Sequence, residues 1–300
     1  MLDDDNKWFD RKSKNVLVVG TARNCARYIK EDILEFQSAL QDFNQVHWLV
    51  IESDSKDNTL AKLNELAENI ARFRFISLGM LSKEYPLRTA RIAFCRNTYL
   101  KELRENQIYR EINFVVVMDL DGINQLVTVQ AISSCFIRDD WDVCTANQQD
   151  YYHDIWALRH NLWCPNDCWQ QFQFHIQFGL SHKKAVRTAV KAKQIVIPKD
   201  TDWIEVDSAF GGMAIYHRRV LENGKYIGIR EDGTKICEHV TLHRQIKEQG
   251  FKIFINPALI NGTRTNHGKR FINYVLKQVL NLLGHVKRLT KHSSRRLRRR

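Results

Sequence analysis

The sequence lacks the motifs by which several common protein classes are identified. The first predicted strand is not followed by the GxGxxG pattern of dinucleotide-binding folds, and the GxxxxGK[ST] pattern of P-loop enzymes is absent. No apolar run approaches the roughly 20 residues of a membrane-spanning helix. The segment Met1–Asp5 is acidic where a secretory signal would be basic. We therefore expect a soluble or peripheral protein.

Paired cysteines are also missing. Seven cysteines are scattered along the chain, none of them in a CxxC pair, and only Cys164 and Cys168 lie close together. A disulfide framework is not expected, and a reducing, cytoplasmic location is favoured. A zinc site at Cys164 and Cys168 would need further ligands that the neighbouring sequence does not offer, so buried thiols are the favoured interpretation.

Acidic residues are absent from the carboxyl-terminal segment. Residues 268–300 hold 11 Lys and Arg, so the chain's net charge of +12 leaves +1 for the rest. Apolar residues in 271–289 recur at helical spacing, which predicts a basic amphipathic helix. The favoured partner of 271–300 is an anionic membrane surface. Packing of the apolar stripe on the domain and binding to nucleic acid are alternatives, nucleic acid being the least favoured. The predicted organisation is a domain at 1–268 and a tail at 269–300.

The body of the chain alternates short apolar runs with segments of helical periodicity. Strands are expected at 15–19, 46–51, 73–77, 114–118 and 142–146, and helices at 27–43, 59–71, 88–104 and 128–137. This alternation predicts an α/β fold with a mostly parallel sheet flanked by helices on both faces. The second half is less regular, with helices expected at 183–193 and 238–249, a turn running into a strand at 210–216, and a last strand at 252–255.

The most informative motif is Asp119-Leu120-Asp121, directly after the apolar run Phe114–Met118. Carboxylates at the carboxyl end of a buried strand lie where open α/β sheets bind ligands. Two acids so close together repel each other and are costly to bury unless a cation neutralises them. The motif therefore predicts a divalent metal site, and a diphosphate is the usual group that such a site holds.

Polar clusters also follow the first two predicted strands. The side chains are Thr21, Arg23 and Asn24 after the first strand, and Glu52, Ser53, Asp54, Ser55 and Asp57 after the second. Adjacent strand ends can share one nucleotide, with carboxylates accepting hydrogen bonds from ribose or base. The alternative is a pair of solvated loops in which Asp57 and Thr59 start a helix.

The predicted helix at 88–104 carries Arg88, Arg91 and Arg96, followed by Asn97. An arginine on a largely apolar helix needs an anionic partner, which a diphosphate would provide. A structural salt bridge is the alternative for each of these arginines.

In this order the motifs resemble those of GT-A-fold glycosyltransferases. The segments Tyr151–Arg159, Val206–Gly212 and Glu238–Leu242 are similar to segments of the cryptococcal capsule-associated α-mannosyltransferase group. The resemblance spans roughly 15–268 and implies a GT-A (Rossmann-like) fold. It also implies transfer of a hexose, with mannose the first candidate, from a nucleoside diphosphate sugar to a glycan or lipid-linked glycan, with retention favoured.

The resemblance also implies roles for individual residues. Asp119, Asp121 and His267 are expected to bind Mn²⁺ or Mg²⁺. The donor side is expected to use Thr21, Arg23, Asn24, Glu52, Asp54, Asp57, Arg91, Arg96, Asn97 and Asp119. The acceptor side is expected to use Tyr152, Asp154, Trp156, Arg159, Gly211 and Gly212, where core aromatics and a hairpin turn are the alternative. Candidates for a general base are Asp207, Glu238 and His239.

Two other functions are compatible with parts of this pattern. A nucleotidyltransferase can use the same kind of metal site, but it would be expected to carry a Lys-containing loop after the first strand, and Gly20–Asn24 lacks Lys. A non-enzymatic nucleic-acid-binding or scaffold protein would act through the basic tail.

Overall fold

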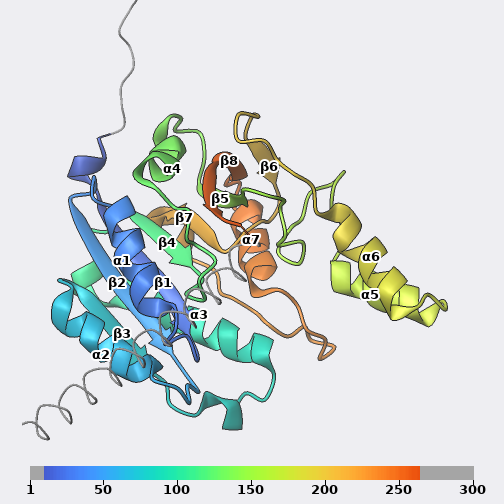
Figure 1. Cartoon of the computed structure of the whole chain (residues 1–300), viewed down its shortest axis with the longest axis horizontal. Coiled ribbons are helices and arrows are strands. Elements are labelled where there is room, and N and C mark those ends of the chain that lie inside the picture. The colour runs from blue at the N-terminus through green and yellow to red at the C-terminus, as the bar shows by residue number, and fades with distance from the viewer. Residues whose placement is uncertain (1–9, 264–300) are drawn as a thin grey trace, which may run out of the picture. The chain divides into compact units, whose positions relative to one another are not determined.

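A computed structural model describes residues 10–263 of the chain. The predicted tail helix and the metal candidate His267 lie outside these residues. The described part forms an eight-stranded sheet in the order β3-β2-β1-β4-β7-β5-β8-β6 (Figure 1). Its strands are β1 (Asn15–Ala22), β2 (Gln45–Glu52), β3 (Phe73–Ser77), β4 (Phe114–Met118), β5 (Val143–Gln148), β6 (Ile204–Val206), β7 (Met213–His217) and β8 (Ile253–Gly262).

The sheet is mixed and mostly parallel. Strands β3, β2, β1 and β4 run parallel to one another, as do β5 and β8, whereas β7 is antiparallel to both β4 and β5 and β6 is antiparallel to β8. The α/β architecture expected from the sequence is confirmed. Because β1, β2 and β4 are parallel neighbours, their carboxyl ends meet at one edge.

Helices cover both faces because alternate residues of each buried strand point to opposite sides. One face packs against α1 (Ile29–Ala39), α2 (Thr59–Asn69) and α4 (Val129–Ser133), and the other against α3 (Arg88–Glu105) and α7 (Glu238–Glu248). In β4, Val115 and Val117 join the core under α3, while Val116 and Met118 join the core under α1. Burial on both sides explains why this strand reads as an unbroken apolar run.

Two elements were not predicted from the sequence. Strand β6 has three residues at the edge of the sheet, and α5 (Cys168–Gln177) lies in the stretch rich in aromatic residues and Gln. Helix α6 (His182–Ala189) is shorter than the predicted segment, because Lys191–Lys193 forms a 3-10 turn. Helices α5 and α6 pack together as a hairpin that stands away from the sheet (Figure 1).

The seven cysteines are all buried and unpaired, in agreement with the interpretation as buried thiols. Among residues 10–263, no helix is long and apolar enough to cross a membrane.

Candidate active site

A pocket of about 380 Å³ opens at the carboxyl ends of β1 and β4. Segments from distant parts of the sequence form its walls: the ends of β1 and β4, one side of α3, the start of α7, and the loop after β5. The predicted residues that line it are Thr21, Arg23, Arg91, Arg96, Asp119, Asp121, Asp154, Trp156, Glu238 and His239. Arg88 lines it as well. The topology therefore brings together residues up to 218 positions apart (Thr21 and His239).

The turn after β4, residues 119–122, is fixed by its own backbone. The Asp119 N–H donates to the Gly212 carbonyl (2.9 Å), and the Gly122 N–H donates to Asp32 Oδ2 (2.8 Å). Gly122 has φ of 87°, and a Cβ there would lie 2.8 Å from the Tyr28 ring. Glycine is thus required both for the backbone conformation and for the space. This turn presents the two carboxylates to the pocket.

Arg96 joins two of the pocket's carboxylates. Its guanidinium is almost fully buried, and it donates from Nε to Glu238 Oε1 (3.1 Å) and from Nη2 to Asp119 Oδ1 (3.3 Å). Its third contact is to the hydroxyl of Tyr99 (3.3 Å). Truncating such an arginine would leave two acids without their shared cation, a costly change in a buried site.

The pKa of Asp119 is raised in spite of its ion pair with Arg96. Water reaches 39% of its side chain, although the surrounding protein atoms remove much of the hydration of the carboxylate. This burial raises the pKa of Asp119 to about 7; Arg96 opposes the rise, and the carboxylates of Asp121, Asp154 and Glu238 add to it. A cation placed among these acids would favour their ionised form.

The donor set fits a hard divalent cation that keeps some of its own ligands. Asp119 and Asp121 offer carboxylate oxygens, which Mg²⁺ and Mn²⁺ prefer. Residues 10–263 contain no group of three acidic, His or Cys side chains already placed around one point. Phosphate oxygens, water or a residue outside this range would have to complete the coordination, as is usual for Mg²⁺.

Three further arginines line the pocket. Arg23 and Arg88 are exposed at its rim. Arg91 is held by the carbonyls of Tyr85 and Pro86 (both 2.8 Å), and its Nε lies 3.8 Å from Asp54 Oδ2. Four arginines and four carboxylates line the pocket in all, so its formal charge is balanced before any ligand enters.

Acids at the end of β2 and in the loop after it bond mainly to the protein backbone. Glu52 accepts from the Ser55 N–H (2.9 Å) and from the Ser77 hydroxyl, and Asp54 accepts from the Ser82 N–H (2.9 Å). Asp57 accepts from the N–H groups of Thr59 (3.0 Å) and Ala26 (3.2 Å). Neither Glu52, Asp54 nor Asp57 lines the pocket, although Ser53 does. Their predicted role in holding the donor stays a prediction.

Other predicted residues also hold the chain in place. Asn24 accepts from the Lys56 N–H (2.7 Å), and Asn97 exchanges two hydrogen bonds with the backbone of Tyr226 (2.9 Å each). Tyr152 is fully buried, with its hydroxyl accepting from the Phe210 N–H (3.3 Å). Asp207 is exposed beside β6, outside the pocket lining.

The glycine pair after Phe210 approaches the protein's own backbone. Gly211 and Gly212 have φ of 70° and 93°. A Cβ on Gly211 would lie 2.7 Å from the Ala146 carbonyl oxygen. The Gly211 N–H donates to Asp154 Oδ2 (3.1 Å), which holds that carboxylate at the pocket wall.

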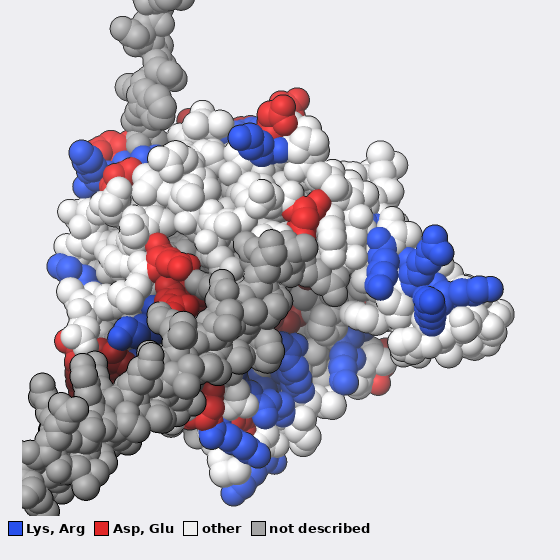
Figure 2. All heavy atoms as spheres, viewed as in Figure 1, with Lys and Arg blue, Asp and Glu red and all other residues white. Residues whose placement is uncertain are grey.

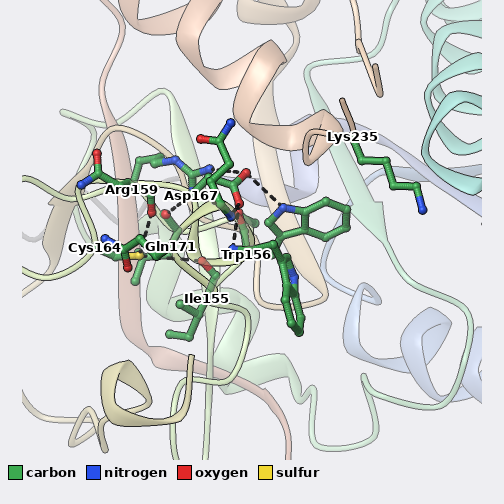
Figure 3. Close-up of polar contacts among 12 residues, drawn as sticks. Ile155, Trp156, Arg159, Cys164, Asp167, Gln171 and Lys235 are labelled. Carbon is green, nitrogen blue, oxygen red and sulfur yellow. Dashed lines mark hydrogen bonds and ion pairs between the residues drawn. The ribbon is translucent and has the colours of Figure 1, made fainter. Parts of the chain in front are cut away.

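Trp156 is positioned by a buried acid that sequence reasoning did not single out. Asp167 Oδ2 accepts from Trp156 Nε1 (3.2 Å), Arg159 Nη2 (3.3 Å) and Arg230 Nη2 (3.4 Å). Figure 3 shows Trp156 and Arg159 converging on this carboxylate. Its Oδ1 caps α5 by accepting from the Trp169 N–H (2.9 Å). Arg159 therefore has a structural partner, and Asp167 links the pocket wall to α5.

His239 is a buried imidazole without a hydrogen-bond partner in the described part of the chain. Its ring stacks on Phe210 with centroids 3.7 Å apart, and Glu238 Oε1 is 3.8 Å from Nε2. Burial, with Arg96 and His243 nearby, lowers the pKa of His239 well below its usual value. The ring is therefore neutral, and it lines the pocket while both of its nitrogens are shielded from water.

A network of neutral amides, also missed from the sequence, lies beneath the turn after β4. Asn261 Nδ2 donates to Asn124 Oδ1 (2.7 Å) and to the Gly211 carbonyl (2.8 Å). Asn124 Nδ2 donates to the Asp119 carbonyl (2.8 Å), and Gln148 Nε2 donates to the Gly211 carbonyl (2.7 Å). The network ties β4, β5, β7 and β8 together at the site. These residues are distant in sequence, so no local pattern indicated them.

No protein-family model and no curated protein matches the chain. Among solved structures it is similar to a mannosyltransferase of Pyrobaculum calidifontis in complex with GDP-Man and Mn²⁺, at 13% identity and a TM-score of 0.47, covering 85% of this chain and 58% of that one. It is also similar to S. aureus TarS in complex with UDP-GlcNAc, at 17% identity and a TM-score of 0.43, covering 77% of this chain and 52% of that one. A third similar structure is glucosyl-3-phosphoglycerate synthase of Mycobacterium tuberculosis in complex with UDP, at 10% identity and a TM-score of 0.41, covering 85% of this chain and 71% of that one. Likenesses this distant do not assign the chain to a family.

Proposed function

We propose that this chain is a metal-dependent glycosyltransferase of the GT-A class, related to the cryptococcal capsule-associated α-mannosyltransferase group. It would move a hexose from a nucleoside diphosphate sugar to a glycan or lipid-linked glycan, with mannose the first sugar to test. One observation carries the proposal. The pocket at the carboxyl ends of β1 and β4 is lined by Asp119, Asp121 and four arginines, at the edge where open α/β sheets bind ligands.

The donor side follows from charge. The pocket is formally neutral, whereas a diphosphate brings a negative charge on each phosphate. Arg23 and Arg88, exposed at the rim, would hold the phosphate oxygens. Asp119 and Asp121 would hold Mn²⁺ or Mg²⁺, and His267 stays the predicted third ligand. When bound, the ion would stabilise the charge that grows on the departing nucleoside diphosphate.

The acceptor side would use the pocket residues of the loop after β5 and the start of α7. Trp156 offers an apolar ring face held by Asp167, and Asp154 offers a carboxylate anchored by the Gly211 N–H. His239 would line the same site with a neutral ring. These groups would orient the sugar and exclude water around it.

Retention is the proposed stereochemistry. The three candidates for a general base are poorly suited to accepting a proton, since Glu238 is tied to Arg96, Asp207 is outside the pocket lining, and burial opposes protonation of His239. An inverting reaction needs a base at the acceptor hydroxyl, whereas a retaining reaction has no need of a strong one. This arrangement supports retention.

The first test is binding of a nucleotide-sugar panel, read as thermal stabilisation with and without Mn²⁺. A ligand that binds the native state at 100 times its Kd stabilises it by about 2.7 kcal/mol. We expect one nucleotide sugar, with GDP-mannose and UDP-GlcNAc among those tested, to raise the Tm only with the metal. Asp121→Asn should abolish the shift, while Asp140→Asn, on a distant loop, should keep it.

Products of turnover separate the proposal from its rival. Release of the nucleoside diphosphate marks a glycosyltransferase, whereas release of pyrophosphate from a nucleoside triphosphate marks a nucleotidyltransferase. If no nucleotide sugar bound in the presence of Mn²⁺, or if only pyrophosphate were released, the proposal would be wrong.

A further inference from the structure

The α5–α6 hairpin ends in an apolar tip that the pocket does not use. Phe174 and Phe178 are 58% and 67% exposed, and their ring centroids are 4.6 Å apart. Leu180, in the turn between the two helices, is half-buried and packs on the small core between them. We call Phe174, Phe178 and Leu180, together with the basic residues that follow them, the hairpin tip.

These rings are not needed to hold the hairpin together. Phe172, Ala185 and Ala189 form a small core between the helices, with Val186 and Val190 packed on it. Phe172 also meets His182 edge-on at 5.1 Å. Two aromatic rings exposed to water are unfavourable, because apolar surface contributes to stability only when it is buried.

The charge of the hairpin has one sign. Residues 168–199 contain six Lys or Arg and no Asp or Glu. Lys183, Lys184 and Arg187 follow the apolar turn and are exposed. Within residues 10–263, none of these three has an ion-pair partner. Figure 2 shows Lys and Arg gathered on the hairpin, with an uncharged surface beside them.

We propose that the hairpin tip docks on an anionic membrane surface. Aromatic and aliphatic side chains enter the boundary between headgroups and acyl chains, while Lys and Arg beside them meet anionic headgroups. Lipid fits the tip better than nucleic acid does. Proteins that stack bases on aromatic rings hold the strand in a basic groove, and the tip is a projecting end (Figure 1).

Docking here would also set the orientation of the pocket. Asp167 caps α5 through one carboxylate oxygen and holds Trp156 of the pocket wall through the other. The hairpin is therefore anchored at the pocket by a buried acid. A membrane bound to the tip would fix the orientation of the pocket relative to the lipid surface, whatever reaction the pocket carries out.

The decisive measurement uses the full chain and a single label. All seven native cysteines are buried, so a cysteine added on the surface can be labelled selectively. An environment-sensitive fluorophore on Gln177→Cys, next to Phe178, should shift to shorter wavelength with phosphatidylcholine vesicles that contain phosphatidylglycerol. The same fluorophore on Ile137→Cys, at a site 68% exposed, should not shift. Vesicle binding without a shift at 177 would overturn the proposal, because another segment would then make the contact.

Substitutions test the two parts of the tip separately. Phe174→Ser with Phe178→Ser should lower partitioning to the anionic vesicles about tenfold, and the control pair Met80→Ser with Ile137→Ser should leave it unchanged. Lys183, Lys184 and Arg187 changed to Ala should abolish the preference for anionic over neutral vesicles at the tip label. The control triple is Arg110, Lys225 and Lys235 changed to Ala. If single-stranded RNA shifted the label at 177 and anionic vesicles did not, the membrane would be the wrong partner.

Discussion

The ends of β2 and β4 carry the same kinds of residue and use them differently. After β2, the carboxylates of Glu52, Asp54 and Asp57 accept hydrogen bonds from the backbone of their own loop and its neighbours. After β4, Asp119 and Asp121 line the pocket, and among residues 10–263 only Arg96 forms an ion pair with either of them. At these two strand ends, the carboxylates with backbone donors are structural groups, and those left facing the pocket are available to a ligand.

The largest effect is expected at the end of β4. Asp121→Asn keeps the shape of the side chain and removes its charge. Because Asp121 is exposed and its side chain has no hydrogen bond within residues 10–263, the free energy of unfolding should change by less than about 0.5 kcal/mol. Loss of a metal ligand should lower kcat/KM for the donor by at least about 100-fold. Kinetics and urea unfolding of the same preparation test this, and parallel losses of activity and stability would place Asp121 with the structural acids.

The contrast between partnered and unpartnered groups extends to two histidines of α7, His243, which has two partners, and His239, which has none in residues 10–263. His243 Nδ1 lies 2.9 Å from the Ser208 hydroxyl, and Nε2 lies 2.7 Å from the Tyr216 hydroxyl. Burial lowers the pKa of His243 to about 3 from an ordinary 6.5. The unfolded chain therefore takes up a proton below pH 6.5 that the native chain refuses. Its contribution to stability is complete above pH 6.5 and falls with pH, by up to about 1.4 kcal/mol per unit.

Urea unfolding from pH 7 to pH 4 measures this dependence. His243→Gln should show a shallower fall in stability with pH than the wild-type chain, by up to one proton. The Gln variant starts from lower stability at pH 7 if it loses one of the two hydroxyl contacts, but only the slope bears on the prediction. Equal slopes would mean that His243 is not the group that titrates.

A smaller effect is expected in the loop after β2. Asp57→Ala removes the acceptor for the N–H groups of Thr59, the first residue of α2, and of Ala26, which lies before α1. The free energy of unfolding should fall by about 1–2 kcal/mol, as for the loss of a helix cap. Donor kcat/KM should fall less than about threefold. Thermal unfolding and kinetics test this together, and a 100-fold loss of activity without loss of stability would make Asp57 a donor ligand after all.

At His239, effects of opposite sign are expected on stability and on activity. His239→Phe replaces a buried ring that has no hydrogen-bond partner in residues 10–263 by an apolar ring of similar shape. Stability should rise by about 1 kcal/mol, since an unsatisfied polar group is removed from the interior. Transfer to the acceptor should fall about tenfold, with donor hydrolysis unchanged. A loss of both stability and donor hydrolysis would indicate that the imidazole only supports the fold.

Sequence reasoning was most successful where local pattern and topology agree. The bounds of β4 were predicted because both of its faces are buried, and Asp119 and Asp121 reach the pocket because parallel strands end at one edge. The sequence could not show the hydrogen-bond partners of Glu52 and Asp57. These include the Ser77 hydroxyl and the Ala26 N–H, which come within reach only after folding. The role of Asp167 could not be predicted, because the local sequence of a helix-capping aspartate does not show whether an indole and two guanidinium groups also bind it.

The amide network beneath the site has a consequence for how the protein ages. Asn261 is followed by Gly262, a pair that is prone to lose its side-chain amide in flexible chains, because glycine lets the next backbone nitrogen attack. Here Asn261 is fully buried within β8, and its Nδ2 donates to two oxygens. Conversion to a carboxylate would set a negative charge against the Asn124 and Gly211 oxygens. A preparation stored partly unfolded would then accumulate molecules in which Asn261 is deamidated and the turn after β4 is disordered.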